Sequence, residues 1–390
     1  MIELLAPAGN LEKLKIAVLY GANAVFIGGK EFSLRSRASN FTLDDIKEGC
    51  DFAHKHNAKV HVTTNILPHN NNLEGLKEYL INLEKCGVDA IICASLYIMN
   101  VALKYTNLEV HVSTQDSVAN VEAINFYKEL GCKRVVLARE VSLDEIKDIR
   151  SKTDLDIEVF IHGGMCSSYS GRCMLSNEMS NRDANRGGCA HSCRWNYDLI
   201  DNGKKINNGN YFSLASKDLC ALKYIPFFID NNVTSLKIEG RMKSTHYIAT
   251  VVNAYRRAID EYYKSKTVDF AKYDYMIRKA ENRLTSIGFY EGNPTINEHL
   301  YTNFGEEPNQ EYIGDVLDYK DGYIIMEVKN YFTKDDTLEI FSPKEELRSF
   351  KIDKILDEDD NEIDICNHPN QIVKIKSPFS VLKYDFIRKL

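Results

Sequence analysis

Along residues 1 to 240, short runs of aliphatic and β-branched residues alternate with longer segments whose apolar positions recur every three or four residues. The short runs predict strands, and the longer segments predict amphipathic helices. Eight strands are expected, at residues 3–6, 24–28, 59–64, 89–94, 109–113, 134–138, 157–161 and 235–238. Helices are expected between most of them, at residues 10–20, 43–54, 73–85, 121–129 and 143–150.

Helix-start signals support this alternation. Thr42 and Ser142 each precede a leucine and two acidic residues, as expected for an N-cap and an acidic first turn. Strand–helix alternation is typical of a parallel sheet, and eight strands favour a closed, TIM-like (β/α) barrel over an open doubly wound sheet. The open sheet would be favoured by a glycine-rich phosphate loop after the first strand, and Pro-Ala-Gly-Asn at residues 7–10 is not that loop.

The remaining segments depart from this pattern. An oversized insert at residues 163–232 is rich in Cys, Asn, Arg and Gly and lacks long apolar runs, so something other than a hydrophobic core must order it. Helical patterns follow at 245–264 and 273–284, and short strands separated by turn residues follow at 312–317, 323–328, 337–341, 350–355 and 371–375. We therefore predict a barrel over residues 1–250 that carries the insert, a helical extension over 251–305, and a small C-terminal β-barrel domain over 306–390.

Composition narrows the class of protein. The chain has 390 residues, 44% of them hydrophobic and 27% charged, which is typical of a folded protein. Its start lacks the pattern of a secretion signal, and no stretch approaches 18 consecutive apolar residues, so a soluble, cytoplasmic protein is expected. The net charge of −7 argues against a basic coat for duplex nucleic acid, and any RNA site should be local.

The strongest chemical signal is a cluster of cysteines in the insert. Ten cysteines in a cytoplasmic chain predict thiols rather than disulfides. Cys166 and Cys173 are separated by six residues, and Cys189 and Cys193 by three, among Gly, Ser, Asn and Arg. This irregular spacing favours an iron-sulfur cluster over tetrahedral zinc, although zinc remains the alternative. Packing roles are expected for the five cysteines in helix, strand or strand-edge contexts, namely Cys50, Cys86, Cys93, Cys132 and Cys366.

Several stretches resemble a known family. Residues 158–176 match the signature Glu-x-Phe-x-x-Gly-(Ser or Ala)-Met-Cys-x4-Gly-x-Cys-x-Leu-Ser with one departure, at Gly164. Further matches lie at residues 5–9, 113–115, 181–189, 193–195 and 235–244. The chain resembles the U32 family, long catalogued as collagenase-like peptidases, and within it the prephenate-dependent tRNA uridine hydroxylases.

The resemblance implies a function and a cofactor. It implies a 4Fe-4S cluster on Cys166, Cys173, Cys189 and Cys193, and conversion of the wobble uridine of tRNA to 5-hydroxyuridine with prephenate as co-substrate. Other branches take the last ligand from a cysteine further downstream, so Cys220 is the alternative to Cys193. A related subgroup acts on ribosomal RNA, and the need for a partner subunit of the same family stays open.

Residues at the carboxyl ends of the predicted strands are expected to line the active face of a barrel. An anionic dicarboxylate such as prephenate needs cationic partners, and a proton must be moved. The candidate catalytic residues are Arg139, His162, Glu239 and Arg241, with Lys237 as a further cation; rim salt bridges are the alternative role. The candidate RNA-binding residues are Arg182, Arg186, Arg194, Arg256 and Arg257.

Two other functions compete with RNA hydroxylation. A peptidase would need a catalytic motif, and the chain has neither a His-Glu-x-x-His pair nor a Gly-x-Ser-x-Gly elbow, while Ser170 has no evident base nearby in sequence. The other alternative is an iron-sulfur scaffold that binds RNA and catalyses nothing.

Overall fold

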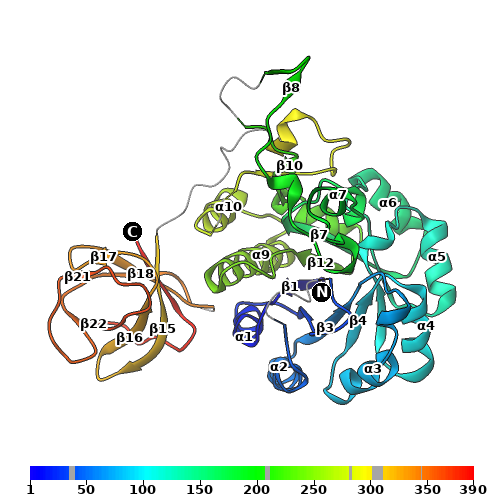
Figure 1. The fold of residues 1–390 in the computed structure, drawn as a ribbon. Coiled ribbons are helices and arrows are strands. Elements are labelled where there is room, and N and C mark those ends of the chain that lie inside the picture. Colours follow the sequence, from blue (N-terminus) through cyan, green and yellow to red (C-terminus); the bar gives the residue numbers. More distant parts are fainter. Residues whose placement is uncertain (35–39, 207–210, 281–282, 301–310, 344) are drawn as a thin grey trace.

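The computed structural model describes residues 1–34, 40–206, 211–280, 283–300, 311–343 and 345–390. Its larger part is a closed parallel barrel in which each strand pairs with the next and the last strand pairs with both β7 and β1 (Figure 1). The predicted (β/α) barrel is confirmed. Its strands are β1 (Glu3–Pro7), β2 (Ala24–Gly28), β3 (Lys59–Thr64), β4 (Ala90–Cys93), β5 (Glu109–Val112), β6 (Arg134–Val136), β7 (Asp156–Gly163) and β12 (Ser235–Ile238).

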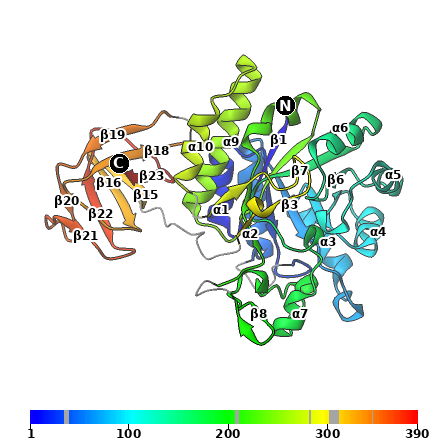
Figure 2. The ribbon, with the colours of Figure 1, turned by 90° about the horizontal axis from the view of Figure 1, so that it is seen from above.

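Helices surround the barrel (Figure 2). They are α1 (Leu11–Leu19), α2 (Leu43–Lys55), α3 (Leu76–Lys85), α4 (Leu96–Tyr105), α5 (Val121–Leu130), α6 (Leu143–Lys152), α8 (Ile225–Asp230), α9 (Thr245–Ser265) and α10 (Phe270–Arg278). The expected caps are present, because Thr42 and Ser142 each form a capping box with the third helical residue. Within the described residues, no helix has both the length and the apolar character needed to cross a bilayer.

The interior of the barrel holds a buried chain of charges. Glu158 is fully buried, and its carboxylate contacts Lys237 Nζ at 2.8 Å and Arg134 Nη1 at 3.1 Å. Arg134 pairs in turn with Glu3 near the amino ends of the strands. All four side chains lie on inward positions of their strands, so the network runs along the barrel axis. A buried charge is tolerated only when it is paired, and here the pairing is continuous.

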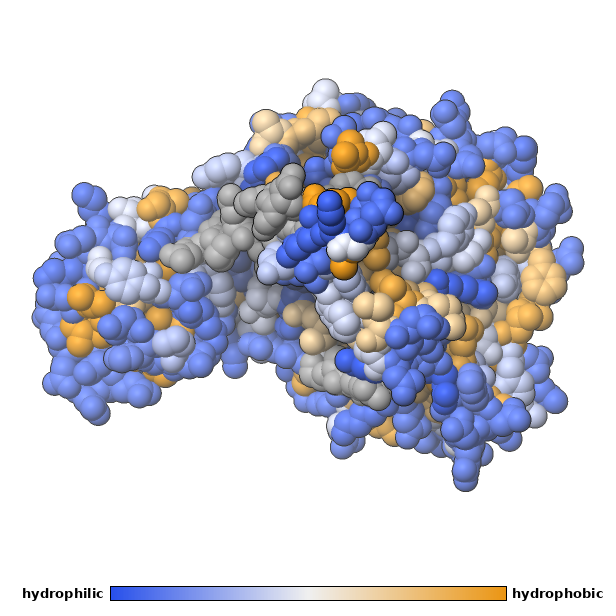
Figure 3. Space-filling view, turned by 45° about the horizontal axis from the view of Figure 1, so that its top comes forward, coloured by the Kyte–Doolittle hydropathy of each residue, from blue (hydrophilic) through white to orange (hydrophobic). Residues whose placement is uncertain are grey.

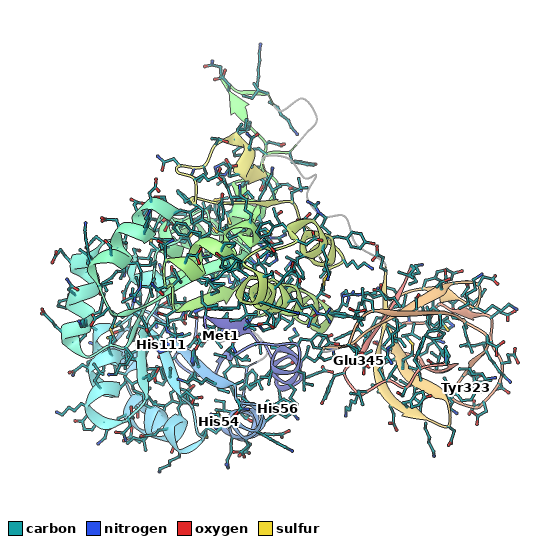
Figure 4. The ribbon with its side chains drawn as sticks, turned by 180° about the vertical axis from the view of Figure 1, so that it is seen from behind. Met1, His54, His56, His111, Tyr323 and Glu345 are labelled. Atoms are coloured by element: carbon teal, nitrogen blue, oxygen red, sulfur yellow. The ribbon has the colours of Figure 1, made fainter. Side chains whose placement is uncertain are left out.

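Two histidines share this interior. The rings of His61 and His111 meet edge to face, with their centroids 4.9 Å apart, and Figure 4 places His111 among the barrel strands. Burial lowers the pKa of His61 to about 3, and it lowers the pKa of His111 as well. Both rings are therefore neutral at physiological pH.

The insert between β7 and β12 contains mostly short elements. They are α7 (Leu175–Ser180), β8 (Ile200–Asp201), β9 (Lys204–Lys205), β10 (Ala215–Ser216) and β11 (Asp218–Cys220). Strand β11 runs antiparallel to β7 and also pairs with β13 (Thr285–Ser286), while β10 pairs with β14 (His299–Leu300). The insert is thus fixed to the barrel at its root, and β8 and β9 project away from it (Figure 1).

The C-terminal domain is an antiparallel sheet of seven strands in the order β19-β18-β23-β15-β16-β22-β20, curved into a half-barrel. Its strands are β15 (Tyr312–Lys320), β16 (Tyr323–Val328), β18 (Thr337–Phe341), β19 (Arg348–Lys351), β20 (Ile355–Leu356), β22 (Ile372–Lys376) and β23 (Phe386–Lys389), with β17 (Phe332–Thr333) and β21 (Ile365–Cys366) paired beside them. The predicted small β domain is confirmed, whereas the boundary expected at residue 250 falls inside the continuous helix α9.

The two domains share a buried interface beside α9. Phe341 and Phe386 of the C-terminal sheet belong to the same hydrophobic core as the barrel helices. Arg388 is 1% exposed and donates to His246 Nε2 at 2.8 Å and to Thr250 Oγ1 at 2.6 Å, both on α9. Figure 4 places Glu345 on the side of this domain that faces the barrel and Tyr323 on its far side. The domain is therefore packed onto the barrel through apolar and charged contacts.

Candidate functional site

A pocket of about 390 Å³ opens at the carboxyl ends of the barrel strands, between the barrel and the insert. Phe26, Ile92 and Phe160 form its apolar floor. Its polar lining includes four cysteines, four cationic side chains and one carboxylate, which are Cys166, Cys173, Cys189, Cys193, Arg139, Arg182, Lys237, Arg241 and Glu239. The four cysteines expected to bind a cluster thus line one cavity.

Repeated chain reversals bring these cysteines together. Residues with a left-handed backbone occur throughout the loop, at Ser170, Gly171, Asn181, Gly187 and His191. Glycine and asparagine adopt this conformation most readily, which accounts for the abundance of these residues in the insert.

Polar contacts replace a hydrophobic core in this loop. Asn185 clamps the backbone of Cys173, accepting from its N–H at 3.3 Å and donating to its carbonyl at 3.1 Å. Arg172 donates to the carbonyl of Gln115 at 2.5 Å and pairs with Asp116 at 3.2 Å. Burial raises the pKa of Asp116 to about 6, although Arg172 opposes the shift. The loop is therefore tied to the strand ends by specific hydrogen bonds.

The thiols have surroundings suited to a large ligand. Burial raises the pKa of Cys166, while the nearby guanidinium of Arg139 favours its thiolate. Cys189 is exposed, and Cys173 and Cys193 are half-buried. Among the described residues, no three His, Cys, Asp or Glu side chains already form a group that could hold a single metal ion. A cubane cluster is larger than one ion, and four thiols around a cavity are the donor set that it takes.

Cys220 lies outside the pocket lining. Its Sγ contacts Tyr255 Oη at 3.8 Å, and it hydrogen-bonds to His162 in the neighbouring strand. Burial would raise the pKa of the Cys220 thiol, but the hydrogen bonds from His162 and Tyr255 leave it below its ordinary value. The structure therefore brings Cys193 rather than Cys220 to the cavity.

His162 is placed behind the pocket and does not line it. A bulge shifts the register between β7 and β12, so that Lys237 pairs with Phe160 but Ile238 pairs with His162. This shift moves the imidazole from the inward side of β7 to the outward side, where Nδ1 lies 3.3 Å from Tyr255 Oη. His162 is thus separated from the other candidate catalytic residues, whereas Arg139, Glu239 and Arg241 share the cavity.

Two cations flank one aromatic ring in the pocket. The guanidinium of Arg139 lies 4.0 Å from the ring centroid of Phe160, and Lys237 Nζ lies 5.4 Å from the same centroid. Lys237 is 4% exposed and is held by the buried carboxylate of Glu158. Both charges are therefore positioned against an apolar surface, where screening by water is weak.

Arg241 crosses the pocket wall at a glycine. Its Nη2 donates to Asn40 Oδ1 at 3.0 Å, and its Nη1 contacts Ser33 Oγ at 3.4 Å. A Cβ atom at Gly28 would lie 2.1 Å from Nη2, so a larger residue there would displace the guanidinium. The glycine that ends β2 thus makes room for this cation.

The candidate RNA-binding arginines do not form one surface. Arg182 lines the pocket, and Arg186 donates to Asn72 at 2.9 Å. Arg194 lies against the insert backbone, with its Nη2 3.2 Å from the position of a Cβ at Gly164. The remaining two lie on α9, where Arg256 pairs with Asp260 and Arg257 donates to the carbonyl of Glu345. These last two hold structural contacts far along the chain from the cysteines.

The sequence interpretation did not identify the apolar floor or the supporting role of Glu158. Phe26 and Phe160 occupy inward positions of β2 and β7, beside Lys237 of β12. The sequence could have indicated the role of Glu158, because a carboxylate at an inward position of a mainly apolar strand needs a charged partner inside the barrel.

Comparisons with known proteins agree with this architecture. Residues 9–300 match the domain described as peptidase family U32, and residues 308–388 match the peptidase family U32 C-terminal domain. The chain is 46% identical to the tRNA hydroxylation protein P1 of Bacillus subtilis (strain 168), across 99% of this chain and 94% of the relative. It is 32% identical to the tRNA hydroxylation protein P of Haemophilus influenzae, across 99% and 96%. It is 39% identical to the 23S rRNA 5-hydroxycytidine C2501 synthase of Escherichia coli (strain K12), across 66% of this chain and 39% of that protein. The chain belongs to peptidase family U32.

Proposed function

We propose that this protein is an RNA hydroxylase that acts on tRNA, converting the wobble uridine to 5-hydroxyuridine with prephenate as co-substrate and a 4Fe-4S cluster as cofactor. Relatives that match nearly the full length of this chain are named for tRNA hydroxylation, which supports tRNA as the substrate. The observation that carries the proposal is that four thiols and several cations line a single pocket at the catalytic end of a barrel.

Cys166, Cys173, Cys189 and Cys193 would hold the cluster. When bound, the cluster would supply redox or Lewis-acid chemistry beside the target base. Asn185 fixes the backbone of Cys173, and Arg172 ties the same loop to the end of β5. These contacts would keep the thiols in place while the cluster is inserted.

The cations support an anionic co-substrate that also has an apolar ring. Prephenate carries one carboxylate on a six-membered ring and a second on its pyruvyl side chain, and the pocket offers Arg139 and Lys237 beside the ring of Phe160. Arg139 lines the pocket with its guanidinium over the ring of Phe160, a position from which it would pair with a carboxylate of the co-substrate. Bidentate pairing with a guanidinium would fix one carboxylate, and the ammonium of Lys237 would hold the other.

Glu239 is the carboxylate of the lining and is half-buried. It would hold or move a proton at the target base, because a general acid or base must lie within hydrogen-bond reach of the reacting atoms. His162 is not assigned this role, since it lies behind the wall of the pocket.

The test is nucleoside mass spectrometry on tRNA and rRNA from a strain that lacks this protein. Loss of 5-hydroxyuridine from tRNA is expected, with restoration by the wild-type chain and by Cys86→Ser, and no restoration by Cys173→Ser or Lys237→Met. Cys86 is the matched control because it caps α3 and does not line the pocket. Loss of a hydroxylated nucleoside from rRNA alone would replace tRNA with rRNA as substrate. Unchanged nucleosides in both RNAs would refute the proposal.

A further inference from the structure

The part of the insert beyond the cysteines forms a projecting arm, which we define as residues 195–206 and 211–214. Tyr197 and Phe212 form an antiparallel bridge at its base, and β8 pairs with β9 at its tip. Asn202 and Gly203 make the turn, both with positive φ, as a two-residue hairpin requires. An isolated two-stranded hairpin is marginally stable in water, so the arm is suited to a binding partner.

Exposed apolar side chains concentrate on the arm and on the loop at its root. Nine of the 26 exposed large hydrophobic residues of the described chain lie within residues 164–217, which is about one-seventh of the sequence. They are Tyr169, Met174, Met179, Trp195, Leu199, Ile200, Ile206, Tyr211 and Leu214. Figure 3 shows the face with the arm, where hydrophobic and hydrophilic residues are intermixed. Nine residues are more than twice the share expected for one-seventh of the chain, which makes this region a candidate interaction surface although its apolar side chains are not contiguous.

The charge of this region differs from that of the whole chain. Residues 164–217 contain seven Lys and Arg against four Asp and Glu, a formal charge of +3, whereas the whole chain carries −7. Lys205 lies 5.6 Å from the ring centroid of Tyr211 and pairs with Asp198 at 2.6 Å. The arm itself carries two Lys against two Asp, whereas residues 164–194 carry four Arg against two acidic residues. The loop at the root of the arm therefore supplies most of the positive charge that complements a polyanion, and the arm supplies the aromatic rings.

The position of this surface restricts its partner. The root of the arm follows directly from Cys193, whose carbonyl accepts from the N–H of Leu214 at 3.0 Å. Met174 and Tyr169 flank Cys173 and Ser170, which line the pocket. An RNA is too large to enter a cavity of about 390 Å³, so only its target base can do so, and the neighbouring nucleotides must lie on the rim.

We propose that the arm and the rim residues Tyr169 and Met174 form the RNA-docking surface, and that this surface takes an unpaired single-stranded loop rather than a duplex. The inference rests on the proposed function, in that the pocket below is where the base reacts. Tyr169, Trp195 and Tyr211 stack on exposed bases, and the few cations contact one or two phosphates. Duplex RNA offers no base faces for stacking and would require a broad basic surface. A protein subunit seated here would instead cover the entrance through which the base passes.

Binding by the full-length, anaerobically purified protein tests the docking surface. The probes are a fluorescently labelled RNA stem–loop and a fully paired duplex of equal length, read by anisotropy. Trp195→Ala and Tyr211→Ala should each weaken stem–loop binding by roughly fivefold to a hundredfold, the usual effect of losing one base-stacking ring. Phe126→Ala is the control, because Phe126 is 52% exposed on α5 and should leave binding unchanged. Iron content should equal that of the wild type in all three variants.

Salt dependence gives an independent measure. One or two phosphate contacts on a single strand predict that log K falls with log salt with a slope of roughly −1, far shallower than for a basic duplex-binding surface. Equal affinity of the wild type for duplex and stem–loop would overturn the proposal. It would also be overturned if Trp195→Ala and Tyr211→Ala kept the cluster and bound the stem–loop within twofold of the wild type. Altered oligomeric state by light scattering with unchanged RNA affinity would also overturn it and would identify a protein interface. Because binding is read without turnover, failure here differs from failure of the hydroxylase proposal, which is read in cellular nucleosides.

Discussion

Replacing Glu158 with glutamine tests the charge chain inside the barrel. The side chain is fully buried, with one carboxylate oxygen 2.8 Å from Lys237 Nζ and the other 3.1 Å from Arg134 Nη1. Glutamine keeps the shape but removes the negative charge. Arg134 would keep Glu3 and the more distant Asp156 as partners, whereas no ion pair among the described residues joins Lys237 to either carboxylate. Lys237 would lose its ion-pair partner and its fixed position in the pocket.

The size of the effect follows from the pKa of Glu158. Burial would raise this pKa, but Lys237 and Arg134 hold it at about 2, below the ordinary value of 4.5. The difference corresponds to about 3 kcal/mol of stability, which agrees with the roughly 3–5 kcal/mol lost on breaking a buried ion pair. Because the pKa is lower in the folded state, this contribution is present above pH 4.5 and is lost as the pH falls from 4.5 toward 2.

Thermal unfolding under anaerobic conditions measures this loss. Glu158→Gln should lower the Tm by roughly 5–10 °C at pH 7. Lys237→Met should also destabilise, because Glu158 would keep only Arg134 as a partner. The variant that carries both substitutions should lose less free energy of unfolding than the sum of the two single losses, by about 1–3 kcal/mol. A Tm of Glu158→Gln within one degree of the wild type, or strict additivity, would refute the buried network.

Three further predictions concern other parts of the molecule. Cys173→Ser should abolish both the iron content and the absorbance at about 400 nm of anaerobically purified protein, whereas Cys220→Ser should retain both. The reverse result would place Cys220 among the ligands. His246 is neutral in the folded state because burial and Arg388 lower its pKa. The free energy of unfolding should therefore fall as the pH drops below about 6.5. His246→Gln should reduce this pH dependence by up to about 1.4 kcal/mol per pH unit. Arg388→Met should leave Glu339 with only Lys279 in the interface and should speed limited proteolysis between the domains; equal rates would count against the interface.

The barrel could be predicted from the sequence because strand and helix patterns alternate cleanly. Each of the eight predicted barrel strands overlaps a strand of the structure, and the capping signals at Thr42 and Ser142 function as expected. The sequence does not predict strand β23, because two of its four residues, Arg388 and Lys389, are cationic and the apolar run is only two residues long. It nevertheless lies between β18 and β15, where Arg388 contacts His246 of α9 as well as Phe341 and Glu339 of its own domain. The contact with His246 depends on two segments far apart in the chain.

Residues of the site could be predicted where the residue type and its sequence neighbours alone identify them. Cysteines in a loop of Gly, Ser and Asn have no packing role, and the four selected by this criterion line one pocket. The direction in which a side chain points was not predictable. The bulge opposite β12 turns His162 outward, and a register shift leaves no trace in a single sequence. Arg256 and Arg257 look like free cations in sequence, but their partners come from α9 itself and from the C-terminal domain.

Closure of the barrel has a consequence for how the chain matures. Strands β7 and β12 are direct neighbours, yet residues 164–234, which include the cysteine-bearing insert, separate them in sequence. Pairing of these strands is thus a long-range event that loop entropy makes slow relative to the local β/α units before it. During synthesis, all four thiols leave the ribosome before the strand that closes the barrel over them. The cysteines therefore emerge before the barrel can close, and at that stage the chain would be most sensitive to oxidants and, for the cluster proposed above, most accessible to a carrier.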